Sequence, residues 1–356
     1  MGILSKESSV TFVIIQNGSG GIEPWINKAR AVIKIPLLME GALVCLALSF
    51  VIQNVSASTG DRSQMFHSCL ENCLAENCSA IAQEFHIPLH LRLLQWTCSD
   101  ECKYFCMWPT VDWFIEAGIG AQQFYGKWPF LRIFGVQEPA AAIFSILNLA
   151  CHVAMIRRFN KEVNSKAPFY WLTNIFCFVC CHAWFWSTLF HVRDVRFTEI
   201  MDYLGAFSMV LFSVYHFSLR ATALSSFSSL SSIIFGSAIG LFFVYHSYTT
   251  FFVKMDYGYN MLINIAFGAV NILGWSVWCF KHYKKRPYVK RCAAFTSLVA
   301  VTTLLEILDF PPFFWVLDAH ALWHMTTSPL VVLWYRFLID DCHFLESQVM
   351  DYEKIA

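Results

Sequence analysis

Long apolar stretches between residues 134 and 340 constrain this 356-residue chain more than any other feature. A helix needs about 20 predominantly apolar residues to cross the hydrocarbon core of a bilayer. Seven segments approach that length, and they are 137–156, 169–190, 201–219, 231–252, 260–280, 292–309 and 321–339. The pattern predicts an all-α polytopic membrane protein with seven transmembrane helices. The last segment is the weakest, because it begins near His320 and His324.

The composition agrees with a membrane protein. Hydrophobic residues make up 57% of the chain and charged residues 14%, whereas a soluble domain is about 45–50% apolar and about 25% charged. This balance excludes a disordered chain, a fibrous repeat and an ordinary cytosolic enzyme. The 25 basic and 25 acidic residues cancel, so the chain lacks the basic surplus of nucleic-acid-binding domains, and no nucleic-acid partner is expected.

Residues 1–57 are predicted to be an N-terminal extension and a signal peptide. Basic residues precede an apolar run over 41–52, and small residues follow at Val55 and Ala57. This is the layout of a secretory signal, so we expect cleavage near Ala57. An uncleaved signal anchor is the alternative. A start at Met39 would give a signal of more ordinary length.

Residues 58–133 form a soluble block with six cysteines, namely Cys69, Cys73, Cys78, Cys98, Cys102 and Cys106. Six cysteines in a short segment after a signal peptide indicate three disulfides in an oxidising lumen. The sequence does not choose among the possible pairings. A zinc site is the alternative for the regular spacing of the last three cysteines. Asn77, in Asn77-Cys78-Ser79, is a candidate for N-glycosylation.

The basic residues of the loops predict the orientation in the membrane, because Lys and Arg mark cytoplasmic loops. The loops after the first, third and fifth predicted spans are the basic ones, with Arg157, Arg158, Lys161, Lys166, Arg220, Lys281, Lys284, Lys285, Arg286, Lys290 and Arg291. We therefore expect a lumenal cysteine-rich domain over 58–133, a seven-helix membrane domain over 134–340 and a cytoplasmic tail over 341–356.

Polar side chains inside the predicted spans are the functional clue, because such groups are costly in lipid and indicate a site. Ser187 and His191 are four residues apart at the end of the second span. Asp202 opens the third span, and His320 and His324 are four residues apart at the start of the seventh. A spacing of four puts both members of a pair on one helix face. The predicted topology puts all five residues at the lumenal surface.

Two histidines at this spacing can bind one metal ion, as in many zinc hydrolases. His191 would be a third ligand and would leave one position open for water, which is the pattern of a catalytic Zn²⁺ site. Structural roles are the alternatives: Asp202 could cap a helix, and Ser187 could bond to its own backbone.

Glu306 and Asp309 flank the end of the sixth predicted span. We expect them to pair with Arg193 or Arg196, with orientation of a zinc ligand as the alternative. The remaining histidines in or near spans are expected to be packed or interfacial, and they are His152, His182, His216 and His246.

The linked motif Ser187-x3-His191, Asp202 and His320-x3-His324 resembles the CREST superfamily of membrane hydrolases, which includes alkaline ceramidases and adiponectin-receptor-like proteins. A narrower resemblance, over about residues 58–341, is to the post-GPI-attachment lipid-remodelling (Per-like) family. It rests on the stretches WTCSDECKYFCMW (96–108), GKWPF (126–130), FHVRD (190–194), LDFPP (308–312) and DAHALWH (318–324). The extra N-terminal residues are the one departure from the family pattern.

The resemblance implies fatty-acid remodelling of GPI-anchored proteins by a phospholipase A2-type activity. The reaction would remove the unsaturated sn-2 acyl chain of the phosphatidylinositol moiety. The implied partners are GPI-anchored proteins and membrane lipids, and the implied location is the Golgi membrane, with the ER as the alternative. The sequence says nothing about the oligomeric state.

The mechanism that we expect is ester hydrolysis by a water that zinc activates. His191, His320 and His324 would bind the ion, Asp202 would act as general base, and Ser187 would hold the oxyanion or the water. Ser187 as nucleophile is the rival chemistry. Two other classes remain open, a ceramidase-like amidase and a non-catalytic seven-span receptor or chaperone.

Overall fold

The computed structural model describes residues 58–78, 87–222 and 229–355. These residues are mostly helical, and the β-structure among them is limited to isolated bridges. The predicted all-α class is therefore confirmed. The predicted signal peptide, its cleavage near Ala57 and the alternative start at Met39 lie outside the described residues.

The cysteine-rich region is built on two antiparallel helices, α2 (Gln64–Asn77) and α4 (Cys98–Glu116), with the short α3 (Leu89–Leu93) between them. Ser63 caps α2 by accepting a hydrogen bond from the Phe66 amide, and Thr97 and Asp100 form a capping box on α4. These caps satisfy backbone groups that the first helical turn leaves without partners.

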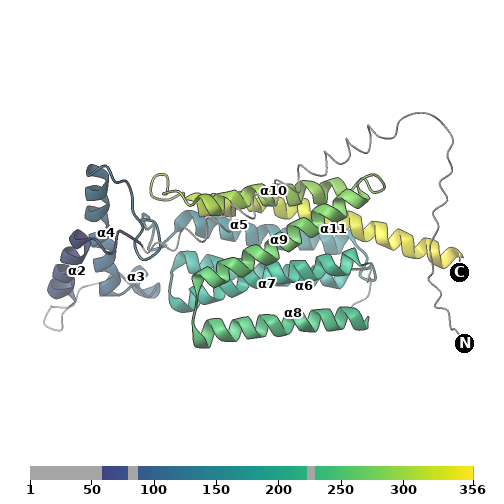
Figure 1. Ribbon diagram of the computed structural model, residues 1–356, viewed down its shortest axis with the longest axis horizontal. Helices are drawn as coiled ribbons and strands as arrows, with labels where there is room; N and C mark the ends of the chain where they lie inside the picture. Colours follow the sequence, from purple (N-terminus) through teal and green to yellow (C-terminus); the bar gives the residue numbers. More distant parts are fainter. Residues whose placement is uncertain (1–57, 79–86, 223–228, 356) are drawn as a thin grey trace, which may run out of the picture. The chain divides into compact units, whose positions relative to one another are not determined.

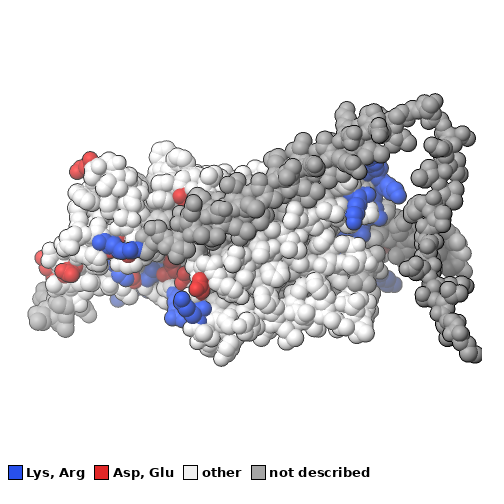
Figure 2. Space-filling view, in the orientation of Figure 1, with Lys and Arg blue, Asp and Glu red and all other residues white. Residues whose placement is uncertain are grey.

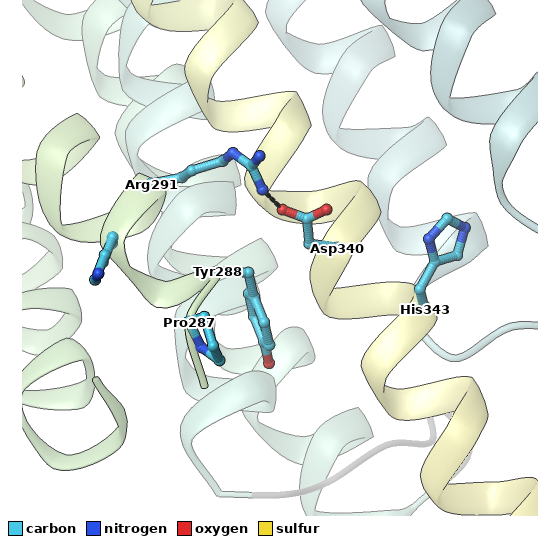
Figure 3. Close-up of a pocket in the computed structure, with 6 residues that line it drawn as sticks. Pro287, Tyr288, Arg291, Asp340 and His343 are labelled. Atoms are coloured by element: carbon cyan, nitrogen blue, oxygen red, sulfur yellow. Dashed lines mark hydrogen bonds and ion pairs between the residues drawn. The ribbon is translucent and has the colours of Figure 1, made fainter. Parts of the chain in front are cut away.

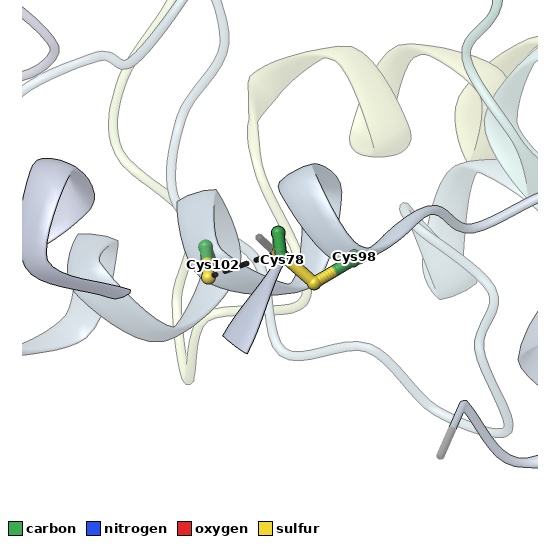
Figure 4. A group of neighbouring side chains, drawn as sticks. All are labelled: Cys78, Cys98 and Cys102. Atoms are coloured by element: carbon green, nitrogen blue, oxygen red, sulfur yellow. Dashed lines mark hydrogen bonds between the residues drawn. A yellow bond between two sulfur atoms is a disulfide. The ribbon is translucent and has the colours of Figure 1, made fainter. Parts of the chain in front are cut away.

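Three disulfides join α2 to α4 like the rungs of a ladder, Cys69–Cys106, Cys73–Cys102 and Cys78–Cys98. The spacing is four and then five residues along α2 and its C-cap, and four residues along α4. It presents the cysteines on facing sides, and the antiparallel direction determines the pairing. The predicted disulfides are thus confirmed. Figure 4 shows the end of the ladder, where Cys102 Sγ lies 3.9 Å from Cys78 Sγ. Because all six sulfurs are in disulfides, they do not provide thiolate ligands, and the alternative of a zinc site here is not supported.

Within the part of the chain that the structure describes, five helices are long and apolar enough to cross a membrane, which makes this a multi-pass membrane protein. They are α5 (Pro139–Glu162), α6 (Tyr170–Val192), α7 (Arg196–Ala221), α8 (Leu230–Tyr248), which continues into the π-helical turn η1 (Thr249–Val253), and α9 (Tyr257–His282). On the face shown in Figure 2, the charged side chains gather at the two ends of the described part, and a broad uncharged zone separates them. That zone has the character of a surface that faces lipid.

The sixth and seventh predicted spans fall on α10 (Val289–Leu308) and α11 (Ala319–Ile355). Helix α11 continues beyond the predicted end at 339, so most of the predicted tail is part of this helix and not a separate segment. Both helices pack into the same bundle, α10 against α9 and α11, and α11 against α5.

The contacts between the membrane helices close a ring in the order α5, α6, α7, α9, α10 and α11. Helix α8 packs on α7 outside this ring, and it is the outermost of these helices in Figure 1. Large aromatic side chains such as Trp275, Trp334 and Phe337 fill the centre. A buried ion pair, Arg220 Nε to Asp341 Oδ2 at 2.5 Å, ties α7 to α11. This packing fixes the ends of the helices relative to one another. The candidate site lies at one end of the ring.

Candidate metal centre

The three histidines singled out by their spacing converge at one end of the bundle. His191 is in the last turn of α6, and His320 and His324 are in the first turns of α11. The Nε2 atom of His320 lies 3.3 Å from Nε2 of His191 and 2.9 Å from Nε2 of His324. His191 and His324 are 1% and 2% exposed, whereas 33% of the His320 side chain is exposed. The cluster is therefore buried on two sides and open at His320.

Each histidine is held through its other ring nitrogen, Nδ1. Glu138 Oε2 lies 2.7 Å from Nδ1 of His191, and Glu306 Oε2 lies 2.7 Å from Nδ1 of His320. Ser145 Oγ lies 2.8 Å from Nδ1 of His324. Metal-ligating histidines commonly have such partners, which orient the ring and fix its tautomer.

These partners determine which nitrogen carries the proton. An ionised carboxylate only accepts hydrogen bonds, so the Nδ1 groups of His191 and His320 donate. The Ser145 hydroxyl donates to the Ala141 carbonyl at 2.8 Å, so it accepts from Nδ1 of His324. We therefore assign the proton to Nδ1 in all three rings, which leaves three unprotonated Nε2 atoms facing one another.

This donor set fits a divalent metal ion. Three converging lone pairs repel one another unless a cation lies between them, and imidazole nitrogen is a preferred ligand of zinc. With Zn–N bonds of about 2.0–2.1 Å, two ligands of a tetrahedral ion lie about 3.3 Å apart, close to the two Nε2 separations in this cluster. The three ligand atoms all lie within 4.8 Å of one another. His191, His320 and His324 could thus hold zinc.

The backbone explains why Glu138 meets His191. The C-terminal carbonyls of α6 lack partners within the helix, and the segment before α5 supplies them. The amide of Glu138 donates to the His191 carbonyl at 2.9 Å, and the amide of Gln137 donates to the Val192 carbonyl at 3.0 Å. This pairing places the Glu138 side chain beside the His191 ring.

A side-chain cap defines the start of helix α11. Asp318 Oδ1 accepts a hydrogen bond from the Ala321 amide at 2.8 Å and so caps the first turn. The 309–318 connection returns the chain from the end of α10, so this turn lies beside Glu306. The position of His320 thus follows from a helix cap and from the packing of the two helix ends.

Ser187 and Asp202 also lie beside the histidines. Ser187 is buried on α6, one turn before His191, and its Oγ lies 3.1 Å from Ser145 Oγ. Asp202, on α7, lies within interaction distance of the Ser187 side chain and of the His191 and His320 rings. The structure therefore brings the five predicted residues together from three helices, although their chemical roles remain predictions.

Lys127 connects the cysteine-rich region to the cluster. Its ammonium group pairs with Glu138, lies 3.0 Å from Asp194 and sits over the Phe190 ring. Burial alone would lower the pKa of Lys127, but the two carboxylates raise it above its ordinary value. Burial alone would raise the pKa of Glu138, but Lys127 and His191 hold it well below its usual range. Glu138 is therefore an ionised acceptor for His191.

The predicted pairing of Glu306 and Asp309 with Arg193 or Arg196 is wrong. Glu306 contacts His320, because the end of α10 meets the start of α11. Asp309 accepts from Trp128 Nε1 at 2.7 Å and from Gln123 Nε2 at 2.9 Å. Arg193 pairs instead with Asp100 at 2.7 Å. The alternative for Glu306, orientation of a ligand histidine, agrees with this geometry.

The other histidines of the predicted spans lie apart from the cluster. His152, His216 and His246 are buried, and their rings contact the aromatic rings of Tyr335, Trp275 and Phe207, in that order. His182 is exposed on α6 and accepts from Trp186 Nε1 at 3.0 Å. These positions agree with packed or interfacial roles.

Sequence reasoning missed Glu138, Ser145 and Lys127. Glu138 lies at the edge of a predicted span, directly before Pro139, where a carboxylate attracts no notice. Ser145 lies within an apolar run, and small hydroxyl residues there commonly bond to their own backbone. Lys127 is part of the GKWPF stretch, and that motif is the one signal that could have found it.

Asn77, the candidate for glycosylation, is in the last turn of α2, where its side-chain amide donates to the Cys73 carbonyl at 3.1 Å. Its neighbour Cys78 is in a disulfide. Ser79, the third residue of the sequon, lies outside the described residues, so glycosylation of Asn77 stays a prediction.

The fold and the cluster together define a class, that of multi-pass helical membrane proteins with a buried three-histidine centre at one end of the bundle. The chain belongs to the Per1-like family, whose model matches residues 88–342. The predicted family is thereby confirmed.

Curated relatives match most of the chain. It is 42% identical over 308 residues to "Post-GPI attachment to proteins factor 3" of Drosophila melanogaster, covering 84% of this chain and 91% of the relative. It is 40% identical over 303 residues to "GPI-specific phospholipase A2-like PGAP3" of Homo sapiens, covering 84% and 94%. The relative of the same name from Danio rerio is 43% identical over 299 residues, covering 82% and 93%. No solved structure matches the chain.

Proposed function

We propose that this protein remodels the fatty acids of GPI-anchored proteins by hydrolysing the unsaturated sn-2 acyl ester of the GPI phosphatidylinositol. The relatives' names support the substrate class. The single observation that supports hydrolysis is the set of three Nε2 atoms that face one another while Glu138, Glu306 and Ser145 hold the opposite ring nitrogens.

The residues have distinct roles in the proposed reaction. His191, His320 and His324 would hold the ion, and zinc in such a site would supply a water that is acidic enough to deprotonate near neutral pH. Asp202 takes the proton of the attacking water. The carbonyl carbon gains the water oxygen and loses its bond to the glycerol oxygen, which receives the proton from Asp202. The products are a free fatty acid and a lyso-GPI.

Ser187 supports this reaction by donating a hydrogen bond to the developing oxyanion. The geometry argues against Ser187 as the nucleophile. A serine nucleophile needs a histidine base within hydrogen-bond distance, but the hydrogen-bond partners of the Ser187 side chain are Ser145 and Asp202. Nδ1 of His191 is already bonded to Glu138.

The proposed reaction also implies a topology. We propose that α10 and α11 span the bilayer as well, and that 58–133 is a lumenal domain after a cleaved signal peptide. The cluster then lies at the lumenal face of the Golgi membrane, with the ER as the alternative. The partly exposed side chains of His320 and Glu306 support lateral access, because an acyl chain could approach the cluster from the bilayer.

The test uses cells that lack the protein and express a GPI-anchored reporter. The natural chain, His320→Ala or His182→Ala is restored at equal expression, and mass spectrometry determines the sn-2 chain of the reporter. His182 is the matched control, because it is a histidine exposed on α6 away from the cluster. We expect the natural chain and His182→Ala to give the saturated anchor and His320→Ala to leave the unsaturated one. Full rescue by His320→Ala would overturn the zinc mechanism.

Asp202→Asn separates a hydrolase from a receptor or chaperone that binds zinc for stability. A hydrolase loses its general base but keeps its zinc and its fold, whereas a non-catalytic protein supports remodelling unchanged. Adding ceramide to the purified protein distinguishes the amidase alternative, since release of sphingosine would favour it.

A further inference from the structure

A charged groove lies at the end of the bundle opposite the histidine cluster, between α10, α11 and α5. Figure 3 shows one part of it, where Tyr288 and Arg291 face Asp340 and His343 across the groove. This part is open to solvent and has a volume of about 580 Å³. A second cavity of about 170 Å³ adjoins it and shares Arg291 and Asp340. The lining side chains of the second part include Arg158, Glu162 and Arg336.

The groove has more cations than carboxylates. Arg291 pairs with Asp340, and Arg158 pairs with Glu162 at 2.6 Å. Lys290 and Arg336 also line the groove. Both are exposed, and neither has an acidic partner within ion-pair distance among the described residues. The groove therefore offers two uncompensated cations beside two paired ones, which is the charge pattern of an anion site.

The position of the groove across the bilayer matches the level of the lipid headgroups. Asp340 follows His320 by twenty residues on the continuous helix α11, which is a rise of about 30 Å, the thickness of the hydrocarbon core. If the histidine cluster is at one interface, the groove is at the other. Beyond the groove, α10 exposes the apolar side chains of Leu298 and Val301, which could contact acyl chains below a bound headgroup.

We propose that this groove binds the phosphate-bearing headgroup of an anionic phospholipid from the leaflet opposite the histidine cluster. Basic pockets between membrane helices recognise such headgroups. Lys290 and Arg336 contact the phosphate, and the paired Arg291 provides a further donor. The proposal is independent of the proposed hydrolysis.

The test compares the full-length protein in detergent with two double variants. Lys290→Gln/Arg336→Gln removes the uncompensated cations of the groove. Lys284→Gln/Lys285→Gln removes the same charge from exposed positions in the neighbouring loop, outside the groove. Native mass spectrometry measures binding of short-chain phosphatidylinositol 4-phosphate, phosphatidylserine and phosphatidylcholine, and of soluble inositol phosphate.

We expect both anionic lipids to bind more tightly than phosphatidylcholine, and the groove variant to lose affinity by about tenfold or more while the loop variant keeps it. Equal losses of lipid affinity in the two variants would overturn the proposal, because the attraction would then come from general surface charge. Equal affinity for phosphatidylcholine would overturn it as well, and inositol phosphate binding as tightly as the lipid would show a site for soluble anions instead. Bound lipid should also protect Lys290 from amine acylation in the natural chain, a measurement that needs no variant.

Discussion

The carboxylate of Glu138 lies 2.7 Å from Nδ1 of His191, although Glu138 precedes the first membrane helix of the ring and His191 is in the last turn of the second. The contact exists because backbone amides at 137 and 138 satisfy the last carbonyls of α6. The hydrogen bonds that the last carbonyls of α6 require thus place the Glu138 carboxylate beside His191, a candidate metal ligand. The same carboxylate bonds to Lys127, so the contact also joins the cysteine-rich region to the bundle.

Glu138→Gln should weaken zinc binding by about 10–100-fold, the usual cost of losing such a partner. The amide keeps the size of the side chain but removes its charge, so it holds the His191 tautomer less firmly. Zinc retained by the purified protein during competition with a chelator measures the effect. Glu162→Gln, at the far end of α5, is the control and should retain zinc like the natural chain. If Glu138→Gln retains as much zinc as the control, Glu138 does not orient a ligand.

Lys127→Met should destabilise the protein by about 1–3 kcal/mol. Removing one partner of a fully buried pair costs about 3–5 kcal/mol, and the cost is lower here because 25% of the Lys127 side chain is exposed to screening solvent. Lys103→Met is the matched control, since Lys103 is a lysine of α4 with 42% of its side chain exposed, and it forms an i, i+3 pair with Asp100. Thermal unfolding in detergent compares the two variants. Equal midpoints would show that the pair with Glu138 contributes nothing.

Peptide mapping without reduction should recover the three cross-links of the ladder. We expect Cys69 linked to Cys106, Cys73 to Cys102 and Cys78 to Cys98. Replacing Cys73 and Cys102 together by serine should lower stability by about 2–4 kcal/mol and leave the outer cross-links in place. Recovery of Cys69 linked to Cys98 would contradict the antiparallel packing of α2 and α4.

Arg220→Met should destabilise the bundle by about 3–5 kcal/mol, because it leaves the Asp341 carboxylate buried without its cation. The second variant, Arg220→Met/Asp341→Leu, removes both charges and should recover most of that loss. Chemical unfolding of the two variants beside the natural chain measures the difference. A double variant that is no more stable than Arg220→Met would show that the loss comes from packing and not from the unpaired charge.

The sequence by itself determined the features that depend on local pattern. Apolar runs of bilayer length predict the helical membrane fold, and five of the predicted spans lie on helices that meet the length and hydropathy of a span. The cysteines after a predicted signal indicate disulfides. The i, i+4 spacing of His320 and His324 places both on one helix face, because that relation depends on the helix period alone.

Only the tertiary structure decided which residues far apart in the chain touch. The antiparallel packing of α2 on α4 selects one disulfide pairing among those that the sequence left open. The partners Glu138 and Glu306 depend on how helix ends meet, so Glu306 contacts His320 and not an arginine. Such contacts depend on the position of whole helices in the ring, and a pattern of apolar residues specifies which face is buried but not which neighbour it meets.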